Sequence, residues 1–144
     1  MSALQIVCPH CASINRVPGD KPAEKAKCGR CHKLLFEGRS FPVTTANFQT
    51  HVSRNDIPVV VDFWADWCGP CHMMAPAFEQ AAAGLEPSVR FLKADTEAEP
   101  QLAARFQIRS IPTLILFKGG KIAAQQAGAV SEKMLRDWVT QNAR

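Results

Sequence analysis

No hydrophobic run in this 144-residue sequence approaches the roughly 18 residues of a membrane-spanning helix. Its first residues, Met1 to Val7, lack both the basic segment and the long apolar segment of a secretory signal. Internal repeats and low-complexity tracts are absent as well. We therefore expect a soluble, cytoplasmic protein with no membrane partner and an ordinary globular core.

A large charge excess is also missing from most of the chain. Residues 42–144 hold ten basic and ten acidic residues, whereas residues 1–41 hold seven and three, so the net charge of +4 belongs to the N-terminal piece. If four cysteine thiolates of this piece bind one Zn²⁺, the site itself contributes a charge of about −2 and leaves the piece near +2. A charge this small does not favour nucleic acid, and we expect no nucleic-acid partner.

No cysteine stands outside a C-x-x-C pair. The pairs are Cys8 with Cys11, Cys28 with Cys31, and Cys68 with Cys71. In a reducing compartment, paired cysteines indicate metal binding or redox catalysis more than structural disulfides. The first two pairs form the pattern C-x2-C-x16-C-x2-C, which can supply four thiolates to a tetrahedral zinc ion.

We therefore predict that the first two pairs hold one structural Zn²⁺ in a ribbon of short strands near residues 4–7, 14–17 and 34–36. The ribbon has few large apolar residues, so the metal would supply much of its stability. The alternative is a redox-active or disulfide-bonded quartet. His10 and His32 could compete as ligands, but we expect them to be surface residues beside a complete set of four cysteine ligands.

A short polar connection at Gly38, Arg39 and Ser40 predicts two domains, residues 1–38 and residues 39–144, which pack close together. The second domain has the alternating pattern of an α/β protein with a mixed sheet between helices. Strands are expected at 41–44, 59–64, 89–94, 113–117 and 121–126, and helices around Phe48 and Val52 and at 70–84, 99–106 and 131–141. Thr44 or Thr45 should cap the first helix, and His51 on it should face solvent.

The most informative stretch is VVDFWADWCGPCHMMAP, residues 60–76. A nearly continuous apolar run predicts a central strand covered on both faces, which Asp62 interrupts. Gly69 and Pro70 favour the start of a helix, so Cys68 should lie at a helix N-terminus. The partial positive charge there favours the thiolate form of Cys68 over its thiol. Met73 and Met74 are expected to pack inside the helix layer, and Trp64 in the core.

Residues 41–144 resemble a thioredoxin over the whole domain, with Trp67-Cys68-Gly69-Pro70-Cys71 as the active-site motif. The other matching positions are Asp62, Trp64, Pro76, Lys93, Ile111, Pro112, Gly120 and Gly128. With its four-cysteine extension, the chain is similar to the zinc-binding bacterial members of the thioredoxin family. The resemblance implies a monomer with a thioredoxin fold and no bound organic cofactor. It also implies two kinds of partner, disulfide-containing client proteins and an NADPH-dependent thioredoxin reductase.

This resemblance, with the chemistry of the residues, predicts a protein-disulfide reductase. Cys68 would attack the client disulfide, and the more shielded Cys71 would then resolve the mixed disulfide. Asp62, with a pKa raised by burial, would accept the proton of Cys71, and Lys93 would modulate Asp62.

Client docking would use a flat apolar surface. We predict that it comprises Trp67, Gly69, Pro70, Ile111, Pro112 and Gly128, with a cis bond before Pro112 that presents the backbone of Ile111. One alternative function is a zinc-dependent redox switch, holdase or adaptor. An oxidase or isomerase is disfavoured by Gly-Pro between the cysteines. His72 stands where many thioredoxins have lysine, which affects local charge more than reaction class.

Overall fold

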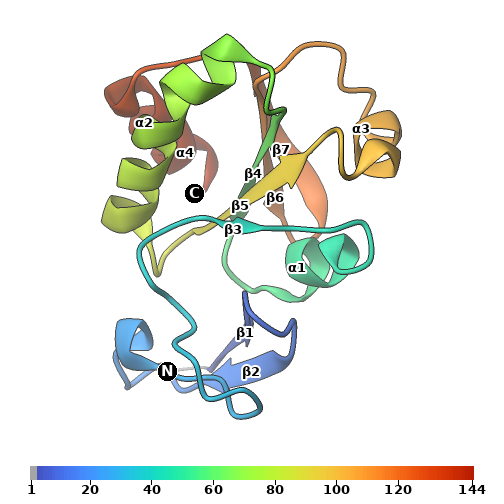
Figure 1. The fold of residues 1–144 in the computed structure, drawn as a ribbon. Coiled ribbons are helices and arrows are strands. Elements are labelled where there is room, and N and C mark those ends of the chain that lie inside the picture. Colours follow the sequence, from blue (N-terminus) through green and yellow to red (C-terminus); the bar gives the residue numbers. More distant parts are fainter. Residues whose placement is uncertain (1–2) are drawn as a thin grey trace.

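The computed structural model describes residues 3–144, which form a small ribbon attached to a five-stranded sheet (Figure 1). In the ribbon, β1 (Leu4–Val7) pairs antiparallel with β2 (Ile14–Val17), and a 3-10 turn η1 spans Ala23–Lys25. The third strand expected at 34–36 is reduced to one bridge between Lys27 and Leu34. Leu35 and Phe36, which follow the bridge, are buried in a small cluster with Ile6 and Val17.

The larger unit has the sheet order β3-β5-β4-β6-β7. Its strands are β3 (Phe41–Pro42), β4 (Val59–Trp64), β5 (Arg90–Asp95), β6 (Thr113–Lys118) and β7 (Lys121–Ala127). Its helices are α1 (Phe48–Arg54), α2 (Gly69–Leu85), α3 (Pro100–Arg105) and α4 (Glu132–Asn142). Strands β3, β5 and β4 run parallel, whereas β6 is antiparallel to β4 and β7. The predicted α/β class and the predicted order of elements are confirmed.

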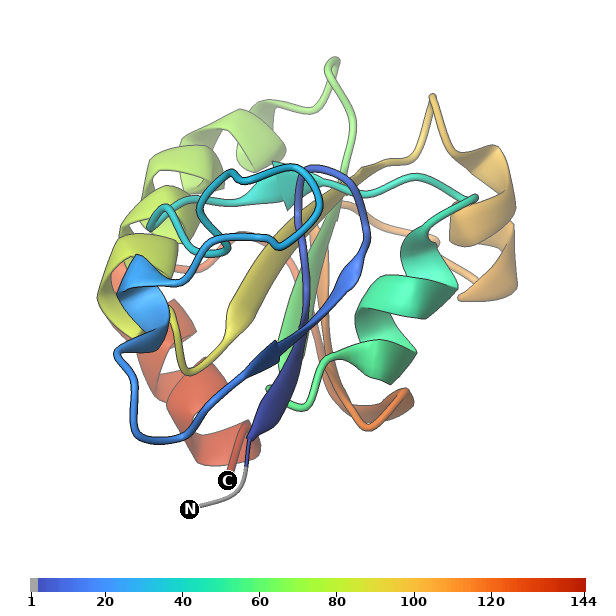
Figure 2. The same ribbon diagram turned by 90° about the horizontal axis from the view of Figure 1, so that it is seen from below.

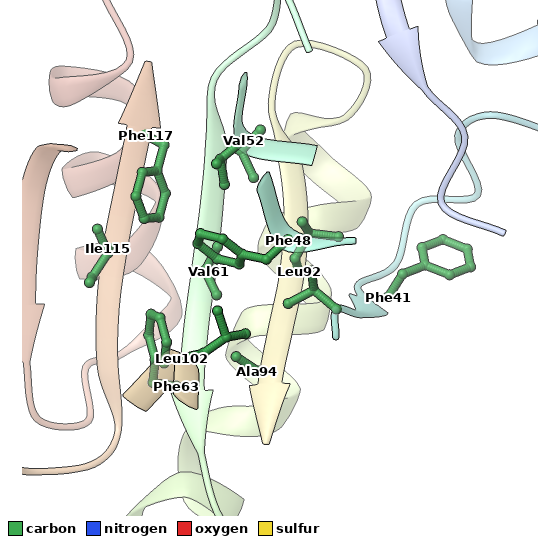
Figure 3. Packing of buried hydrophobic residues seen from close by; sticks show 12 residues of the cluster. Phe41, Phe48, Val52, Val61, Phe63, Leu92, Ala94, Leu102, Ile115 and Phe117 are labelled. Atoms are coloured by element: carbon green, nitrogen blue, oxygen red, sulfur yellow. The ribbon is translucent and has the colours of Figure 1, made fainter. Parts of the chain in front are cut away.

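The central strand β4 is buried on both faces because its side chains alternate between two helix layers. Val61 and Phe63 pack with Phe48 of α1 and Leu102 of α3 (Figure 3). Val60 packs on the opposite face, in a cluster formed with α2 and α4. Strand β4 therefore ends between the two helix layers, and the chain continues from there to the start of α2.

Three local predictions around α1 are wrong. Strand β3 ends at Pro42, and α1 begins at Phe48 after Asn47. Neither threonine is the N-cap of α1, which is Asn47. Thr44 makes a reciprocal pair with Asn47 instead: the Thr44 N–H donates to the Asn47 side chain at 2.8 Å, and the Asn47 N–H donates to the Thr44 hydroxyl at 3.2 Å. The Thr45 hydroxyl donates to a glutamate on another element. His51 does not face solvent but is 1% exposed. It is buried because α1 lies against β1 of the ribbon, and this burial, with Arg90 nearby, lowers the pKa of His51 to about 4.

The ribbon covers the end of the sheet at which β5 begins, as the view from below shows (Figure 2). The Val7 N–H donates to the side chain of Asn55, and the Arg90 guanidinium donates to the carbonyl oxygen of Leu35, both at 2.8 Å. The expectation that the two units pack together is confirmed. This end of the sheet is opposite the N-terminus of α2 (Figure 1). Within residues 3–144, no helix is long and apolar enough to span a membrane.

Candidate functional site

Cys68 and Cys71 form a disulfide at the start of α2, with their Cα atoms 5.3 Å apart. Cys68 is the N-cap residue, and its sulfur accepts a hydrogen bond of 3.2 Å from the backbone N–H of Cys71. Gly69 and Pro70 occupy the first helical positions, where proline costs no hydrogen bond. The sulfur of Cys68 is thus held where unpaired backbone N–H groups and the helix dipole favour negative charge.

The two cysteine residues are equally buried in this disulfide form. Cys68 and Cys71 are each 3% exposed, so the expected difference between an open and a shielded cysteine is absent. Both pack with Ala65, Trp64 and Ile111. The Cys68 sulfur lies 3.7 Å from the carbonyl oxygen of Ile111. The disulfide is therefore covered by the segment that ends at Ile111.

The segment opposite the disulfide has the geometry expected of it. The Ile111–Pro112 peptide bond is cis, and the backbone N–H of Gly128 donates to the Pro112 carbonyl oxygen at 2.8 Å. Ile111 remains partly exposed.

Asp62 is a buried carboxyl group on β4. It is 1% exposed, and neither of its side-chain oxygens has a hydrogen-bond partner. Burial raises the pKa of Asp62 to about 7; Lys93 lowers that pKa and Glu79 raises it further. A carboxyl group with this pKa gains and loses its proton near neutral pH, which suits it to acid-base chemistry.

Lys93 lies directly beside Asp62 in the sheet, because the two residues are register partners between β5 and β4. Its ammonium nitrogen is 4.6 Å from the centre of the Trp64 ring. Trp64 is only partly buried, so it lies between the core and the site. Lys93 is therefore fixed close to Asp62 by the sheet and by a cation–π contact.

Trp67 is the largest exposed group beside the disulfide, with 71% of its surface accessible. Its indole N–H donates to the Glu97 carboxylate at 2.7 Å, which fixes a ring that would otherwise rotate freely. Next to it, a cavity of about 150 Å³ extends to Arg109 and Ile111. Gly69 and Pro70, which follow Cys68, are also exposed.

The sequence predicted neither the exposure of Met73 nor the contact that Glu97 makes. Met73, expected to pack inside, is 81% exposed, whereas Met74 is buried as predicted. Glu97 was missed because its contact with Trp67 joins residues 30 positions apart.

The other four cysteines lie together in the ribbon. Their sulfur atoms are all within 4.8 Å of one another, and none of the four is in a disulfide. The distances from Cys8 to Cys31 and from Cys11 to Cys28 are both 3.6 Å. A tetrahedral site with Zn–S bonds of about 2.3 Å has sulfur atoms about 3.8 Å apart. The four cysteines therefore fit a zinc ion.

The two ribbon pairs share a backbone that differs from the pair in α2. In each, the residue after the second cysteine has a positive φ, 62° at Ala12 and 67° at His32. A backbone N–H donates to the first sulfur at 3.4 Å in both knuckles, from His10 and from Arg30. Such knuckles aim N–H groups at thiolates. His10 bonds instead to Glu37, and neither it nor His32 belongs to the sulfur cluster.

Comparison with known proteins agrees with this division of the chain. A family model described as thioredoxin matches residues 39–141, and a model described as thioredoxin 2, N-terminal, matches residues 7–33. Thioredoxin C-3 of Corynebacterium nephridii is 45% identical over 94% of this chain and 93% of its own length. The thioredoxin of Chlorobaculum thiosulfatiphilum is 43% identical over 68% of this chain and 91% of its own length.

Proposed function

The chain belongs to the thioredoxin family and is a thiol-disulfide oxidoreductase, and on that premise we propose that it reduces the disulfides of client proteins through Cys68 and Cys71. The observation that carries this proposal is the disulfide formed by these two residues at the first turn of α2. The reaction converts a dithiol and a client disulfide into the protein's own disulfide and a client dithiol, so two electrons and two protons pass to the client.

In the first step the thiolate of Cys68 attacks one sulfur of the client disulfide. A mixed disulfide forms, and the other client sulfur leaves as a thiolate that takes up a proton. The helix N-terminus favours the attacking thiolate, and the Cys71 N–H provides one hydrogen bond to its sulfur. The client is proposed to approach along the surface between Trp67 and Ile111, because Ile111 packs against Cys68.

In the second step Cys71 attacks Cys68, which restores the disulfide and releases the client's second thiolate. Cys71 must first lose its proton, and Asp62 is the group proposed to accept it, directly or through a water molecule. Its burial and its lack of hydrogen-bond partners support this role, because both favour a pKa near neutrality. Lys93 limits that rise by its positive charge.

Clients are proposed to dock on the surface formed around the sulfurs. Its members are Trp67, Gly69, Pro70, Ile111, Pro112 and Gly128. An extended client segment would pair with the backbone of Ile111, which gives affinity without demanding a particular side chain. This mode suits a reductase that acts on many different proteins.

We further propose that Cys8, Cys11, Cys28 and Cys31 hold one structural Zn²⁺. When bound, the ion would tie the two knuckles together and stabilise the ribbon. The four close sulfurs and the match to the thioredoxin 2 N-terminal family support the proposal. The finer expectations are a cytoplasmic monomer and an NADPH-dependent thioredoxin reductase that returns Cys68 and Cys71 to the dithiol.

The test is the reduction of insulin disulfides, followed by turbidity, with dithiothreitol or with NADPH and thioredoxin reductase as electron donor. Wild-type protein should be active and Cys68→Ser inactive. Cys71→Ser should accumulate a mixed disulfide with insulin, visible by non-reducing electrophoresis. Intact insulin in the presence of wild-type protein and dithiothreitol would overturn the proposed activity. If the wild-type protein reduces insulin with dithiothreitol but not with NADPH and thioredoxin reductase, only the proposed reductase partner is wrong.

A further inference from the structure

A row of register partners crosses the sheet at the level of Asp62. Pro42 of β3 faces Lys93 of β5, and Lys93 faces Asp62 of β4. The same row continues to Leu114 of β6, which carries no charge. The two charged residues of the row, Lys93 and Asp62, are thus neighbours, and Lys93 is next to β3, where the connection from the ribbon enters the sheet.

Glu79 of α2 is fixed at this side by Ser40, two residues before Pro42. The backbone N–H of Ser40 donates to one oxygen of the Glu79 carboxylate at 2.8 Å, and the Ser40 hydroxyl donates to the other oxygen. Ser40 is 8% exposed. Both oxygens of Glu79 are therefore held by one residue of the junction, which prevents the side chain from swinging into solvent.

The surroundings of Asp62 leave few other charges that act on it. Lys93 faces it from β5, Glu79 of α2 acts on it by its charge, and β6 offers only Leu114. The buried residues of α4, Leu135 and Val139, are apolar. A cavity of about 420 Å³ reaches Ser40, Pro42, Trp64 and Lys93, so solvent meets the cluster from the Lys93 side.

We propose that Glu79, clamped by Ser40, is a positioning residue that acts through Asp62 on the proton transfer from Cys71. Its fixed negative charge opposes that of Lys93, so the two residues together set how readily Asp62 holds a proton. Ser40 belongs to the connection between the ribbon and the sheet. By holding Glu79, this connection therefore affects the protonation of Asp62. The inference rests on the proposed role of Asp62.

The charge of Glu79 acts on the Asp62 carboxyl in a definite direction. A negative charge beside a carboxyl group disfavours its ionised form, and the pKa of Asp62 is raised by Glu79 after the larger effect of burial. Removing that charge should make Asp62 ionise at lower pH. As a proton acceptor, Asp62 would then become active at lower pH as well. The loss of a carboxylate should thus speed the second step on the acidic side of the pH profile.

The variant that tests the proposal is Glu79→Gln, because glutamine keeps the shape of the side chain and an oxygen that can accept from the Ser40 N–H. We expect the pH midpoint of the resolving step, measured by release of a mixed disulfide in rapid mixing, to fall by about half a unit. Lys93→Gln should move it in the opposite direction. Ser40→Ala keeps the charge but loosens the clamp, so its shift should be smaller.

Asp137→Asn, on the exposed surface of α4, is the control for a change in net charge and should leave the midpoint unchanged. The carboxyl of Asp62 can also be titrated directly by carbon NMR in the disulfide form, without any reaction. An unchanged Asp62 titration in Glu79→Gln would overturn the role of Glu79. If the titration shifts while the pH profile of Asp62→Asn matches the wild type, the proposed function of Asp62 fails instead, and Glu79 no longer acts on the reaction.

Discussion

The guanidinium of Arg90 donates a 2.8 Å hydrogen bond to the carbonyl oxygen of Leu35, which joins the first residue of β5 to the ribbon. The same group donates to the Val7 carbonyl oxygen, one residue before Cys8, and lies over the ring of Phe36. Its partner is Glu86, at the end of α2, at 3.1 Å. A fully buried ion pair of the larger unit thus holds both backbone segments that lead into and out of the cysteine knuckles.

Replacement of Arg90 by methionine should destabilise the whole chain. The Glu86 side chain is 2% exposed, so without Arg90 it becomes an unpaired buried carboxylate. Breaking such a pair costs about 3–5 kcal/mol of the free energy of unfolding. Urea unfolding monitored by tryptophan fluorescence measures this loss. A change below about 1 kcal/mol would mean that the ribbon interface does not depend on the pair.

Two further variants separate the ion pair from other effects of the substitution. Lys133→Met removes one member of an exposed pair on α4 and should leave the free energy of unfolding nearly unchanged. Adding Glu86→Gln to Arg90→Met should recover part of the loss, because glutamine carries no charge but can still accept the N–H of Gly38. If the double variant is no more stable than Arg90→Met, desolvation of Glu86 is not the cause.

The raised pKa of Asp62 predicts how stability depends on pH. Its carboxyl titrates at about 7 when folded, whereas the ordinary value is 3.8. Between these pH values the folded chain keeps a proton that the unfolded chain has released, so stability falls as pH rises through this window and then levels off. Above pH 7 the ionised Asp62 carboxyl lowers the free energy of unfolding by up to about 4 kcal/mol. Asp62→Asn should therefore be more stable than the wild type above pH 7 and equal to it near pH 3.

Urea unfolding at a series of pH values measures this difference. The control is Asp137→Asn, since that carboxyl is exposed and its removal should not produce a difference that grows between pH 4 and pH 7. A constant difference between Asp62→Asn and the wild type over the whole range would show that the native pKa of Asp62 is not raised.

Loss of a single ribbon cysteine should remove the proposed zinc ion. In Cys28→Ser, the zinc content measured by atomic absorption should fall from one ion per chain to nearly none, because a structural site loses most of its affinity with one of four thiolates. Cys71→Ser is the matched control and should keep one ion. Retention of zinc in Cys28→Ser, or its loss in Cys71→Ser, would contradict the assignment of the six cysteines.

The three cysteine pairs show how much of the site was predictable. The spacing of the cysteines and their position between a strand and a helix distinguished Cys68 and Cys71 from the other four. Asp62 was identified because it interrupts an apolar run. The resemblance, not the pattern, drew attention to Lys93 and Ile111. The backbone that distinguishes knuckle from helix, such as the positive φ of His32, appears only in the structure.

The predictions that failed depend on contacts between distant parts of the chain. His51 lies on a short helix whose own pattern gives no reason for its burial, and the ribbon that covers it comes from another part of the sequence. Glu79 and Ser40 are 39 positions apart, and nothing in their local sequence relates them. Local periodicity identifies the face of an element, but it does not reveal what a neighbouring domain adds to that face.

The contact between Trp67 and Glu97 predicts a residue that affects client docking without taking part in the chemistry. Glu97→Ala removes the acceptor of the indole N–H and frees an exposed ring, so docking must fix the ring again. A lost hydrogen bond of this kind costs about 0.5–1 kcal/mol, which corresponds to about a two- to five-fold rise in KM for insulin. The kcat should stay near the wild-type value, and so should the rate with a small aromatic disulfide that covers little of the surface.

Glu97→Gln keeps an acceptor oxygen and should restore the KM, whereas Glu132→Ala on α4 should not change it. An equal loss with insulin and with the small disulfide would place the effect of Glu97 on the sulfurs themselves and contradict a docking role.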